Sequence, residues 1–247
     1  MVDYQKIATA ARIKVLDLIY KAQTSHIGSN FSAIDIMSVL FEKMDLDKDK
    51  FVLSAGWKAA SLYYFLWKKG KITEDELNSF CREGSKFIGL AEPIIPEIPI
   101  AGGSMGLGLP GAVGLALAKK LKGEEGMVYV LMSDGEIQIG TTHESMIIAH
   151  HHKLDNLIVI LDWNGFQAMG KIDDILEVPI GQMGQVIDGH NFIEIEQSLH
   201  FHKGNPHYII AKTIKGKGVS FMENQNIYHY KAPSEDEYQL ALKELNG

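Results

Sequence analysis

Two short polar segments, each following an apolar run, carry residue types that could hold a divalent cation. SDGE (133–136) follows the run MVYVLM, and DWNG (162–165) follows the run LIVIL. Asp134 and Asn164 are 30 residues apart, about the length of one strand–helix–strand unit. A carboxylate and an amide oxygen, completed by a backbone carbonyl and phosphate oxygens, suit Mg²⁺ or Ca²⁺, and the absence of thiolates and imidazoles there argues against zinc. The segments predict a metal–diphosphate clamp, in which Gly135 lets a diphosphate approach the backbone.

A simpler interpretation of the same residues is that Asp-Gly and Asn-Gly are turn dipeptides, which are common where strands end. Either dipeptide alone would be weak evidence for a binding site. Both occur together here at the spacing of one strand–helix–strand unit, downstream of the glycine-rich segment GGSMGLGLPG (102–111). This combination favours the clamp.

The elements that must position the clamp alternate between apolar runs and helical segments. The runs 127–132 and 157–161 predict buried strands, and a helix is expected between them. FVLS (51–54), FIEI (192–195) and HYIIA (207–211) predict further strands. Alternation of this kind means parallel strands with right-handed crossovers, so we expect an α/β fold with helices on both faces of a parallel sheet. The carboxyl ends of such strands meet at one edge, where ligands bind.

The first eighty residues are expected to be mainly helical and to pack around this sheet. Apolar residues in 36–44 recur at the spacing of an amphipathic helix. Thr73 and Glu76 form a predicted capping box for a short helix, and 234–245 begins with another and predicts a closing surface helix. Segment 84–100 contains three prolines and predicts an extended loop.

Composition limits the class of protein. The chain has 247 residues, 46% of them hydrophobic and 22% charged, as in ordinary globular proteins, and we expect a single large domain over 1–247. Lys and Arg number 24 against 31 Asp and Glu, a net charge of −7, which argues against nucleic-acid binding. The single Cys81 fits a reducing compartment. The amphipathic N-terminus resembles neither a signal peptide nor a membrane span, so a cytoplasmic protein without membrane partners is expected.

Several segments together resemble a known family. SDGEIQIGTTHESMIIAHHHKLDNLIVILDWNG (133–165) is similar to the thiamine motif of transketolases, Gly-Asp-Gly, a helix, and Asn about thirty residues on. Other matching segments occur in family order: SHIGS (25–29), FVLSAG (51–56), GGSMGLGLPGAVGLALA (102–118), KTIKGKGVSFMEN (212–224) and YHYKAP (228–233). The chain therefore resembles the N-terminal, diphosphate-binding portion of a transketolase, in the thiamine-diphosphate enzyme superfamily.

The resemblance implies a role for each matching residue. Asp134, Asn164 and the backbone carbonyl of Phe166 would hold the metal. Gly135 and Asn164 would contact the diphosphate, and Glu136 belongs to the same cofactor-binding set. The glycine-rich loop would line the cofactor through Gly103, Ser104 and Met105.

Three further residues complete the implied site. Lys215 would face the diphosphate as a point cation. His26 and His229 match histidines that the family places near the cofactor and the reacting hydroxyls of the substrate. Histidine suits that work because its unperturbed pKa of about 6.5 lets it exchange protons near neutral pH. Both histidines are therefore expected to be catalytic, and His229 also to bind cofactor.

The chain departs from the family pattern at four positions. Trp57 and Leu90 stand where the family has histidines, Ile139 replaces a glutamate, and Trp163 replaces the first of two asparagines. Because two hydrogen-bonding histidines are lost near the substrate, we expect a deoxygenated or otherwise modified sugar rather than an ordinary pentose phosphate.

The resemblance implies transfer of a two-carbon ketol unit from a ketose to an aldose, with thiamine diphosphate and Mg²⁺ (or Ca²⁺). A full-length transketolase continues into a pyrimidine-binding domain and a small C-terminal domain, for which 247 residues leave no room. The chain thus resembles the N-terminal subunit of a split transketolase. It is expected to be inactive alone and to join a pyrimidine-domain subunit, as a heterotetramer.

Three alternatives stay open at this point. The subunit could serve another thiamine-diphosphate reaction, such as decarboxylation of a 2-oxoacid or a synthase condensation. It could be a degenerate scaffold that stabilises a partner without binding cofactor. An unrelated nucleotide-diphosphate binder ranks lowest, because GGSMGLG (102–108) does not follow a recognisable strand and so lacks the context of a dinucleotide fingerprint.

Overall fold

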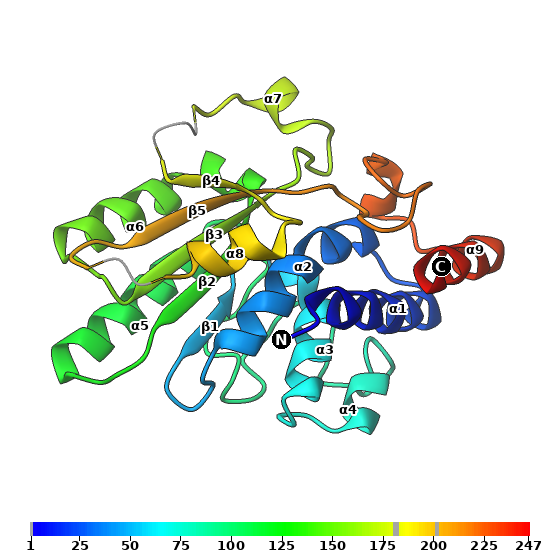
Figure 1. The fold of residues 1–247 in the computed structure, drawn as a ribbon, viewed down its shortest axis with the longest axis horizontal. Helices are drawn as coiled ribbons and strands as arrows, with labels where there is room; N and C mark the ends of the chain where they lie inside the picture. The colour runs from blue at the N-terminus through cyan, green and yellow to red at the C-terminus, as the bar shows by residue number, and fades with distance from the viewer. Residues whose placement is uncertain (1, 180–182, 201–202) are drawn as a thin grey trace.

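A computed structural model describes residues 2–179, 183–200 and 203–247. Its centre is a five-stranded sheet in the order β1-β2-β3-β5-β4 (Figure 1), and every neighbouring pair is parallel. The strands are β1 (Lys50–Leu53), β2 (Val128–Ser133), β3 (Leu157–Trp163), β4 (Gln185–Asp188) and β5 (His207–Lys212). The predicted α/β class with a parallel sheet is confirmed.

Helices cover both faces of this sheet, also as predicted. Figure 1 shows α1 (Tyr4–Ala22), α2 (Ile27–Lys43) and α8 (Phe192–Ser198) on one side, and α5 (Gly108–Lys122) and α6 (Gly140–His151) on the other. The shorter or peripheral helices are α3 (Ala59–Lys68), α4 (Glu74–Asn78), α7 (Ile172–Ile175), α9 (Glu235–Asn246) and the 3₁₀ turns η1 (Gly56–Lys58), η2 (Asp134–Gln138) and η3 (Asn226–His229).

Successive strand residues alternate between two hydrophobic cores. Tyr129 and Leu131 of β2 belong to the core under α1 and α2, whereas Val128 and Val130 belong to the core under α5 and α6. Side chains on a strand point to opposite faces in turn, so a strand covered on both sides must be apolar throughout. This explains why 127–132 and 157–161 read as unbroken apolar runs.

One predicted strand is a helix. FIEI (192–195) forms the first part of α8, where the side chain of Asn191 caps the helix by accepting hydrogen bonds from the backbone N–H groups of Ile193 and Glu194. Four residues are too few to distinguish period 2 from period 3.6, and the Asn cap decides in favour of the helix. Strand β4 was not predicted from the sequence, because this short edge strand buries only Ile187 and has no apolar run.

The predicted local signals elsewhere are confirmed. Thr73 with Glu76, and Ser234 with Glu237, form capping boxes at the starts of α4 and α9. Segment 84–100 contains neither helix nor strand. Among the described residues, no helix is both long and apolar enough to cross a lipid bilayer.

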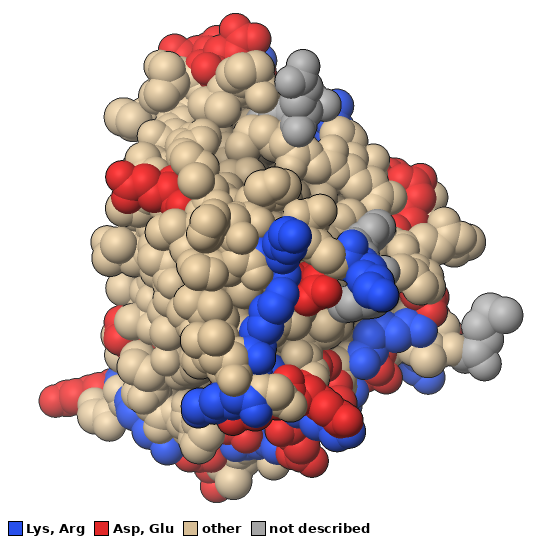
Figure 2. All heavy atoms as spheres, turned by 90° about the vertical axis from the view of Figure 1, so that its left-hand side faces the viewer, with Lys and Arg blue, Asp and Glu red and all other residues tan. Residues whose placement is uncertain are grey.

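Helices α5 and α6 end at the edge of the sheet where the strands begin. Figure 2 faces this end of the molecule, and its lower half shows Lys and Arg side chains lying among Asp and Glu. Local ion pairs account for part of this pattern: Lys120 lies 3.6 Å from Asp155, and Lys122 lies 3.6 Å from Glu124. The residues of the predicted clamp lie at the other edge, where the strands end.

Candidate active site

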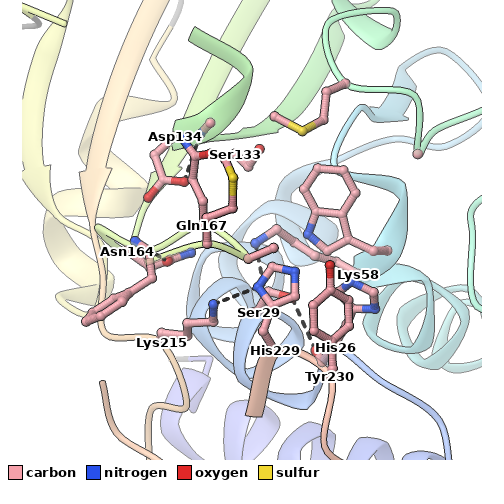
Figure 3. A pocket seen from close by; sticks show the side chains of 17 residues that line it. His26, Ser29, Lys58, Ser133, Asp134, Asn164, Gln167, Lys215, His229 and Tyr230 are labelled. Atoms are coloured by element: carbon pink, nitrogen blue, oxygen red, sulfur yellow. Dashed lines mark hydrogen bonds between the residues drawn. The ribbon is translucent and has the colours of Figure 1, made fainter. Parts of the chain in front are cut away.

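A cavity of about 410 Å³ lies at the carboxyl edge of the sheet, with the predicted clamp in its wall. Segments distant in sequence converge on it: the start of α2, η1, the glycine-rich loop, η2, and the loops that follow β3 and β5 (Figure 3). It is lined by predicted site residues from all of these regions: His26, Gly103, Met105, Asp134, Gly135, Asn164, Phe166, Lys215 and His229. Parallel topology places these residues together, because all strands end at one edge.

Asp134 joins the two loops of the clamp. Its Oδ1 accepts a hydrogen bond of 2.8 Å from Gly135 N, and its Oδ2 accepts one of 2.7 Å from Gly165 N, in the loop that follows β3. Burial raises the pKa of Asp134 to about 7, and the neighbouring negative charge of Asp162 adds to the rise. A buried carboxylate without a cation is electrostatically unfavourable, so this position favours a bound positive charge.

The donor set around Asp134 fits a hard divalent cation. Asn164 is buried in the pocket wall, and its Oδ1 accepts a hydrogen bond of 3.2 Å from Phe166 N. Carboxylate, amide and backbone carbonyl oxygens are the ligands of Mg²⁺ and Ca²⁺. Since Mg²⁺ is usually held by one or two carboxylates together with the phosphates of its ligand, one carboxylate is sufficient here. The residues therefore fit a metal–diphosphate group.

Glycines allow the backbone to approach the cavity closely. A Cβ on Gly135 would lie 3.0 Å from Met105 Cε, and a Cβ on Gly103 would lie 2.9 Å from Leu90 Cδ2. Gly103 also has a φ of +111°, which other residues rarely adopt. Ser104, predicted to line the cofactor, is exposed on the same loop and is not part of the cavity wall.

Lys215 and His229 form a hydrogen-bonded pair that faces the clamp (Figure 3). Lys215 is 1% exposed, and its Nζ donates to His229 Nδ1 at 2.9 Å and to Asn226 Oδ1 at 3.1 Å. Burial lowers the pKa of Lys215 to about 8, and the positive charge of Lys58 lowers it further. An ammonium in this position would be a point cation beside a diphosphate, as predicted.

His26 packs against His229 at the mouth of the cavity. The ring centroids are 5.0 Å apart, and His26 N donates to the backbone O of His229 at 2.9 Å. His26 has a φ of 72°, a left-handed conformation that costs a non-glycine residue free energy and that concentrates at functional sites. The structure thus brings the two predicted catalytic histidines together.

Both imidazoles are neutral at pH 7 in this structure. Burial and the positive charge of Lys215 lower the pKa of His26 to about 4 and that of His229 to about 3. This differs from the sequence-based expectation of a pKa near 6.5, which ignored the two buried ammonium groups. As neutral rings the histidines are suited to hydrogen bonding with hydroxyls, and a bound anion would raise both pKa values.

Glu136 does not line the cavity. It is fully buried, and its carboxylate accepts hydrogen bonds from Ser133 N at 2.8 Å, from Gly106 N at 3.2 Å and from Ser54 Oγ. These three donors lie at the end of β2, in the glycine-rich loop and after β1. Glu136 therefore positions the clamp and the loop relative to each other, rather than facing the cavity as the rest of the predicted set does.

The four departures from the family pattern lie in different surroundings. Trp57 lines the cavity, with its ring 6.3 Å from that of His26. Leu90 lies over Gly103, and Ile139 packs against Gly106, where a Cβ would come within 2.4 Å of Ile139 Cγ2. Trp163 packs against the core under α5 and α6.

Sequence reasoning missed several residues of the cavity wall, among them Lys58, Ser29, Gln167 and Tyr230. Lys58 is fully buried and pairs with Asp162. Asp162 could have been found, because it is a carboxylate at the end of a buried strand next to Asn164. Lys58 carries no such signal, because a lysine at the start of a helix is normally solvated.

Comparisons with known proteins agree with this geometry. The sequence model of one family, described as "Transketolase, thiamine diphosphate binding domain", matches residues 3–246. One of the two subunits of an apulose-4-phosphate transketolase from Actinobacillus succinogenes is 34% identical, over 98% of this chain and 96% of that protein. A 6-deoxy-6-sulfo-D-fructose transketolase subunit from a Clostridium species is 31% identical, over 99% of this chain and 96% of that protein.

A solved transketolase from Campylobacter jejuni has the same fold. It superimposes with a TM-score of 0.92 at 28% identity, and the match covers 100% of this chain. This chain spans only 43% of the length of that solved protein.

Proposed function

The chain belongs to the family of transketolase thiamine diphosphate binding domains, and we propose that it is the diphosphate-binding subunit of a split transketolase. In this role it transfers a two-carbon ketol unit from a ketose to an aldose. The observation that carries the proposal is the double hydrogen bond of Asp134 to Gly135 and Gly165, which joins two loops at the wall of one cavity. Two relatives that match nearly their whole length are named as subunits of transketolases.

The cofactor would be thiamine diphosphate with Mg²⁺ or Ca²⁺. When bound, it supplies the electron sink for carbon–carbon bond cleavage. The chain's own residues hold and orient it: Asp134, Asn164 and the Phe166 carbonyl would bind the metal, and Lys215 would bind a diphosphate oxygen. Gly103, Met105 and Gly135 line the same cavity and leave room for the backbone to approach the ligand. Ser104 and Glu136 support this set from outside the cavity wall.

His26 and His229 would bind the hydroxyl groups of the sugar and exchange protons with them. Lys215 donates to Nδ1 of His229, which leaves the proton of the neutral ring on Nε2. The Nε2–H of His229 can then donate to a hydroxyl or carbonyl oxygen, while Lys215 fixes the ring orientation. Binding of an anionic ligand would raise the pKa of both histidines toward neutrality, where they serve as acid and base.

A separate chain would supply the pyrimidine-binding domain, so that residues 1–247 form the diphosphate-binding domain alone and are inactive without that partner. Large apolar and aromatic side chains at the cavity mouth support this assembly: Met169 is 78% exposed and Tyr230 is 66% exposed. Exposed groups of this kind around a site mark an interaction surface. We propose a heterotetramer of two such pairs. The single Cys81 favours the cytoplasm as its compartment.

The sugar would be a modified one. Trp57 presents an indole to the cavity and Leu90 covers Gly103 with a branched apolar side chain, where family members have histidines. Apolar walls leave a sugar hydroxyl without a hydrogen-bond partner but accommodate a sugar that lacks it. A steady-state comparison of xylulose 5-phosphate with deoxy or branched ketoses tests this, and a clear preference for xylulose 5-phosphate would contradict it.

Calorimetry tests the function as a whole. Thiamine diphosphate is titrated with Mg²⁺ into the chain, and into the chain assembled with a pyrimidine-domain subunit. We expect tight, metal-dependent binding by the assembled protein and ketol transfer from a ketose. Binding without ketol transfer but with carbon dioxide release from a 2-oxoacid would indicate another thiamine-diphosphate reaction. No binding in either form would indicate a scaffold subunit.

A further inference from the structure

The buried residue Lys58 lies in the wall of the candidate active site and has no role in the function proposed above. It follows Trp57 in η1, is 0% exposed, and lines the same cavity as Asp134, Lys215 and the two histidines. Fully buried lysines are rare unless they are paired. Lys58 is paired: its Nζ donates to Asp162 Oδ2 and, at 3.1 Å, to the backbone O of Ser29.

The ion pair fixes the position of the Lys58 ammonium. Asp162 is itself 0% exposed, and its carboxylate also accepts hydrogen bonds from Ser32 Oγ at 2.6 Å and from Thr213 Oγ1. Its two oxygens are therefore held from α2, η1 and the segment after β5. Lys58 thus sits on a rigid base that belongs to the same sheet edge as the clamp.

One N–H of the ammonium remains available to a ligand. A lysine ammonium has three donors, and the part of the chain that the structure describes provides acceptors for two of them, on Asp162 and Ser29. Because Lys58 lines the cavity, the third N–H is accessible from it. Figure 3 shows the Lys58 side chain extending toward the interior of the site, among side chains from several other segments.

The position of Lys58 is central to the site. Its positive charge lowers the pKa values of Asp134, His26, Lys215 and His229, which come from four different segments. A charge felt by all four groups lies between them rather than at the periphery.

We propose that Lys58 is a further ligand-binding residue, whose third N–H donates to an oxygen of the ligand in the cavity. This inference rests on the proposed function, because it takes the ligand to be a diphosphate cofactor with a sugar. The oxygen acceptor belongs either to the diphosphate or to the carbonyl or hydroxyl end of the ketose. Asp162 acts through Lys58 and is a positioning residue.

The competing interpretation is that Lys58 only neutralises Asp162. Removing Lys58 alone does not separate the two ideas, because it leaves a buried carboxylate unpaired. The double variant Lys58→Met/Asp162→Asn removes both charges together. Its amide oxygen can accept from Ser32, and its amide N–H can donate to Thr213, so the fold is retained without an ammonium in the cavity.

The experiment compares the double variant with the unaltered protein in two assays. The first is calorimetric titration of Mg²⁺ and pyrophosphate into the assembled protein, and the second is the KM for hydroxypyruvate, a ketol donor without a sugar tail. We expect a loss of about ten- to a hundredfold, the size for a charge-assisted hydrogen bond. A loss of pyrophosphate affinity assigns the oxygen to the diphosphate, and a rise in KM alone assigns it to the donor.

Wild-type values within twofold in both assays would overturn the inference. If the unaltered protein itself neither binds Mg²⁺–pyrophosphate nor turns over hydroxypyruvate, the proposed function fails instead. NMR of the ¹⁵N-labelled Lys58 ammonium, assigned with Lys58→Arg, requires no double variant. We expect its Nζ resonance to shift on addition of Mg²⁺–pyrophosphate or of hydroxypyruvate to the assembled protein, and an unchanged resonance with both would contradict the inference.

Discussion

The carboxylate of Asp134 accepts a hydrogen bond of 2.7 Å from the backbone N–H of Gly165, across the carboxyl ends of β2 and β3. This bond holds the two clamp loops together. The variant Asp134→Asn keeps an acceptor but loses the charge. We expect Mg²⁺-dependent binding of thiamine diphosphate to weaken by about a hundredfold or more, since hydrogen bonds and ion contacts of a charged group are worth about 1.5–3 kcal/mol each.

Asp47→Asn is a suitable control, because the Asp47 side chain is 89% exposed and lies outside the cavity. It should leave binding unchanged in the same calorimetric titration. Equal losses in both variants would show that Asp134 has no special part in the clamp.

Lys215 is predicted to contribute its charge to diphosphate binding. Lys215→Met should reduce the affinity for Mg²⁺–pyrophosphate by about ten- to a hundredfold, because a buried ammonium forms a charge-assisted hydrogen bond. Lys217→Met in the same loop is the matched control, since Lys217 is partly exposed, lies outside the cavity and comes only within 3.6 Å of Glu223. If Lys217→Met weakens binding as much, the effect belongs to the loop and not to the cation.

Binding should depend on pH on both sides of neutrality. Burial raises the pKa of Asp134 to about 7, so below that pH a cation must displace a proton from the carboxyl. Burial lowers the pKa of Lys215 to about 8, so above that pH an anion must first restore the ammonium. Affinity for Mg²⁺–pyrophosphate should therefore be highest between about pH 7 and pH 8 and fall on either side.

Calorimetry in buffers of different ionisation enthalpy measures these protons directly. We expect proton release on binding at pH 6 and proton uptake at pH 9. A flat pH profile without proton exchange would mean that neither group meets the ligand.

A second buried network supports the loop that carries Lys215. Arg12 donates to both oxygens of Asp35 at 2.9 and 2.8 Å, and its Nε donates to Lys217 O at 2.9 Å. Arg12→Met leaves Asp35 buried with His190 as its other side-chain partner. Breaking a buried ion pair in this way should lower the free energy of unfolding by about 3–5 kcal/mol, measured by urea denaturation. Lys6→Met, at an exposed position of α1, should change it by less than about 0.5 kcal/mol.

The indole of Trp57 is predicted to set sugar preference. Trp57→His restores a hydrogen-bonding ring in the cavity wall, so kcat/KM for xylulose 5-phosphate should rise by about fivefold relative to a modified ketose, the effect of one hydrogen bond of about 1 kcal/mol. Trp67→His on α3, outside the cavity, should leave the ratio unchanged. No change with Trp57→His would remove this residue from the account of specificity.

The sheet and the clamp could be predicted because their signals are local and strong. β2 and β3 are unbroken apolar runs, and Asp134 and Asn164 follow them directly. The parallel topology then required both ends to lie at one edge. The strand predicted at 192–195 was wrong because a single side chain, Asn191, decides between helix and strand there.

Other features depend on contacts between distant segments and leave no local pattern. Lys58 and Asp162 pair across 104 residues of sequence, and Glu136 holds Ser54 and Gly106 from separate loops. The lowered pKa values of His26 and His229 arise from burial and from two buried lysines that only the fold brings near them. Spacing along the chain therefore located the clamp, but not its electrostatic surroundings.

The central claim, a diphosphate-binding subunit that is active only with a pyrimidine-domain partner, is tested most directly by a reconstitution assay. Ketol transfer from a ketose to an aldose is measured with thiamine diphosphate and Mg²⁺ for this chain alone, for the partner alone and for the two mixed. The account predicts turnover in the mixture only, and loss of that turnover when the mixture contains Asp134→Asn. Turnover by this chain alone, or full activity of the mixture with Asp134→Asn, would contradict it.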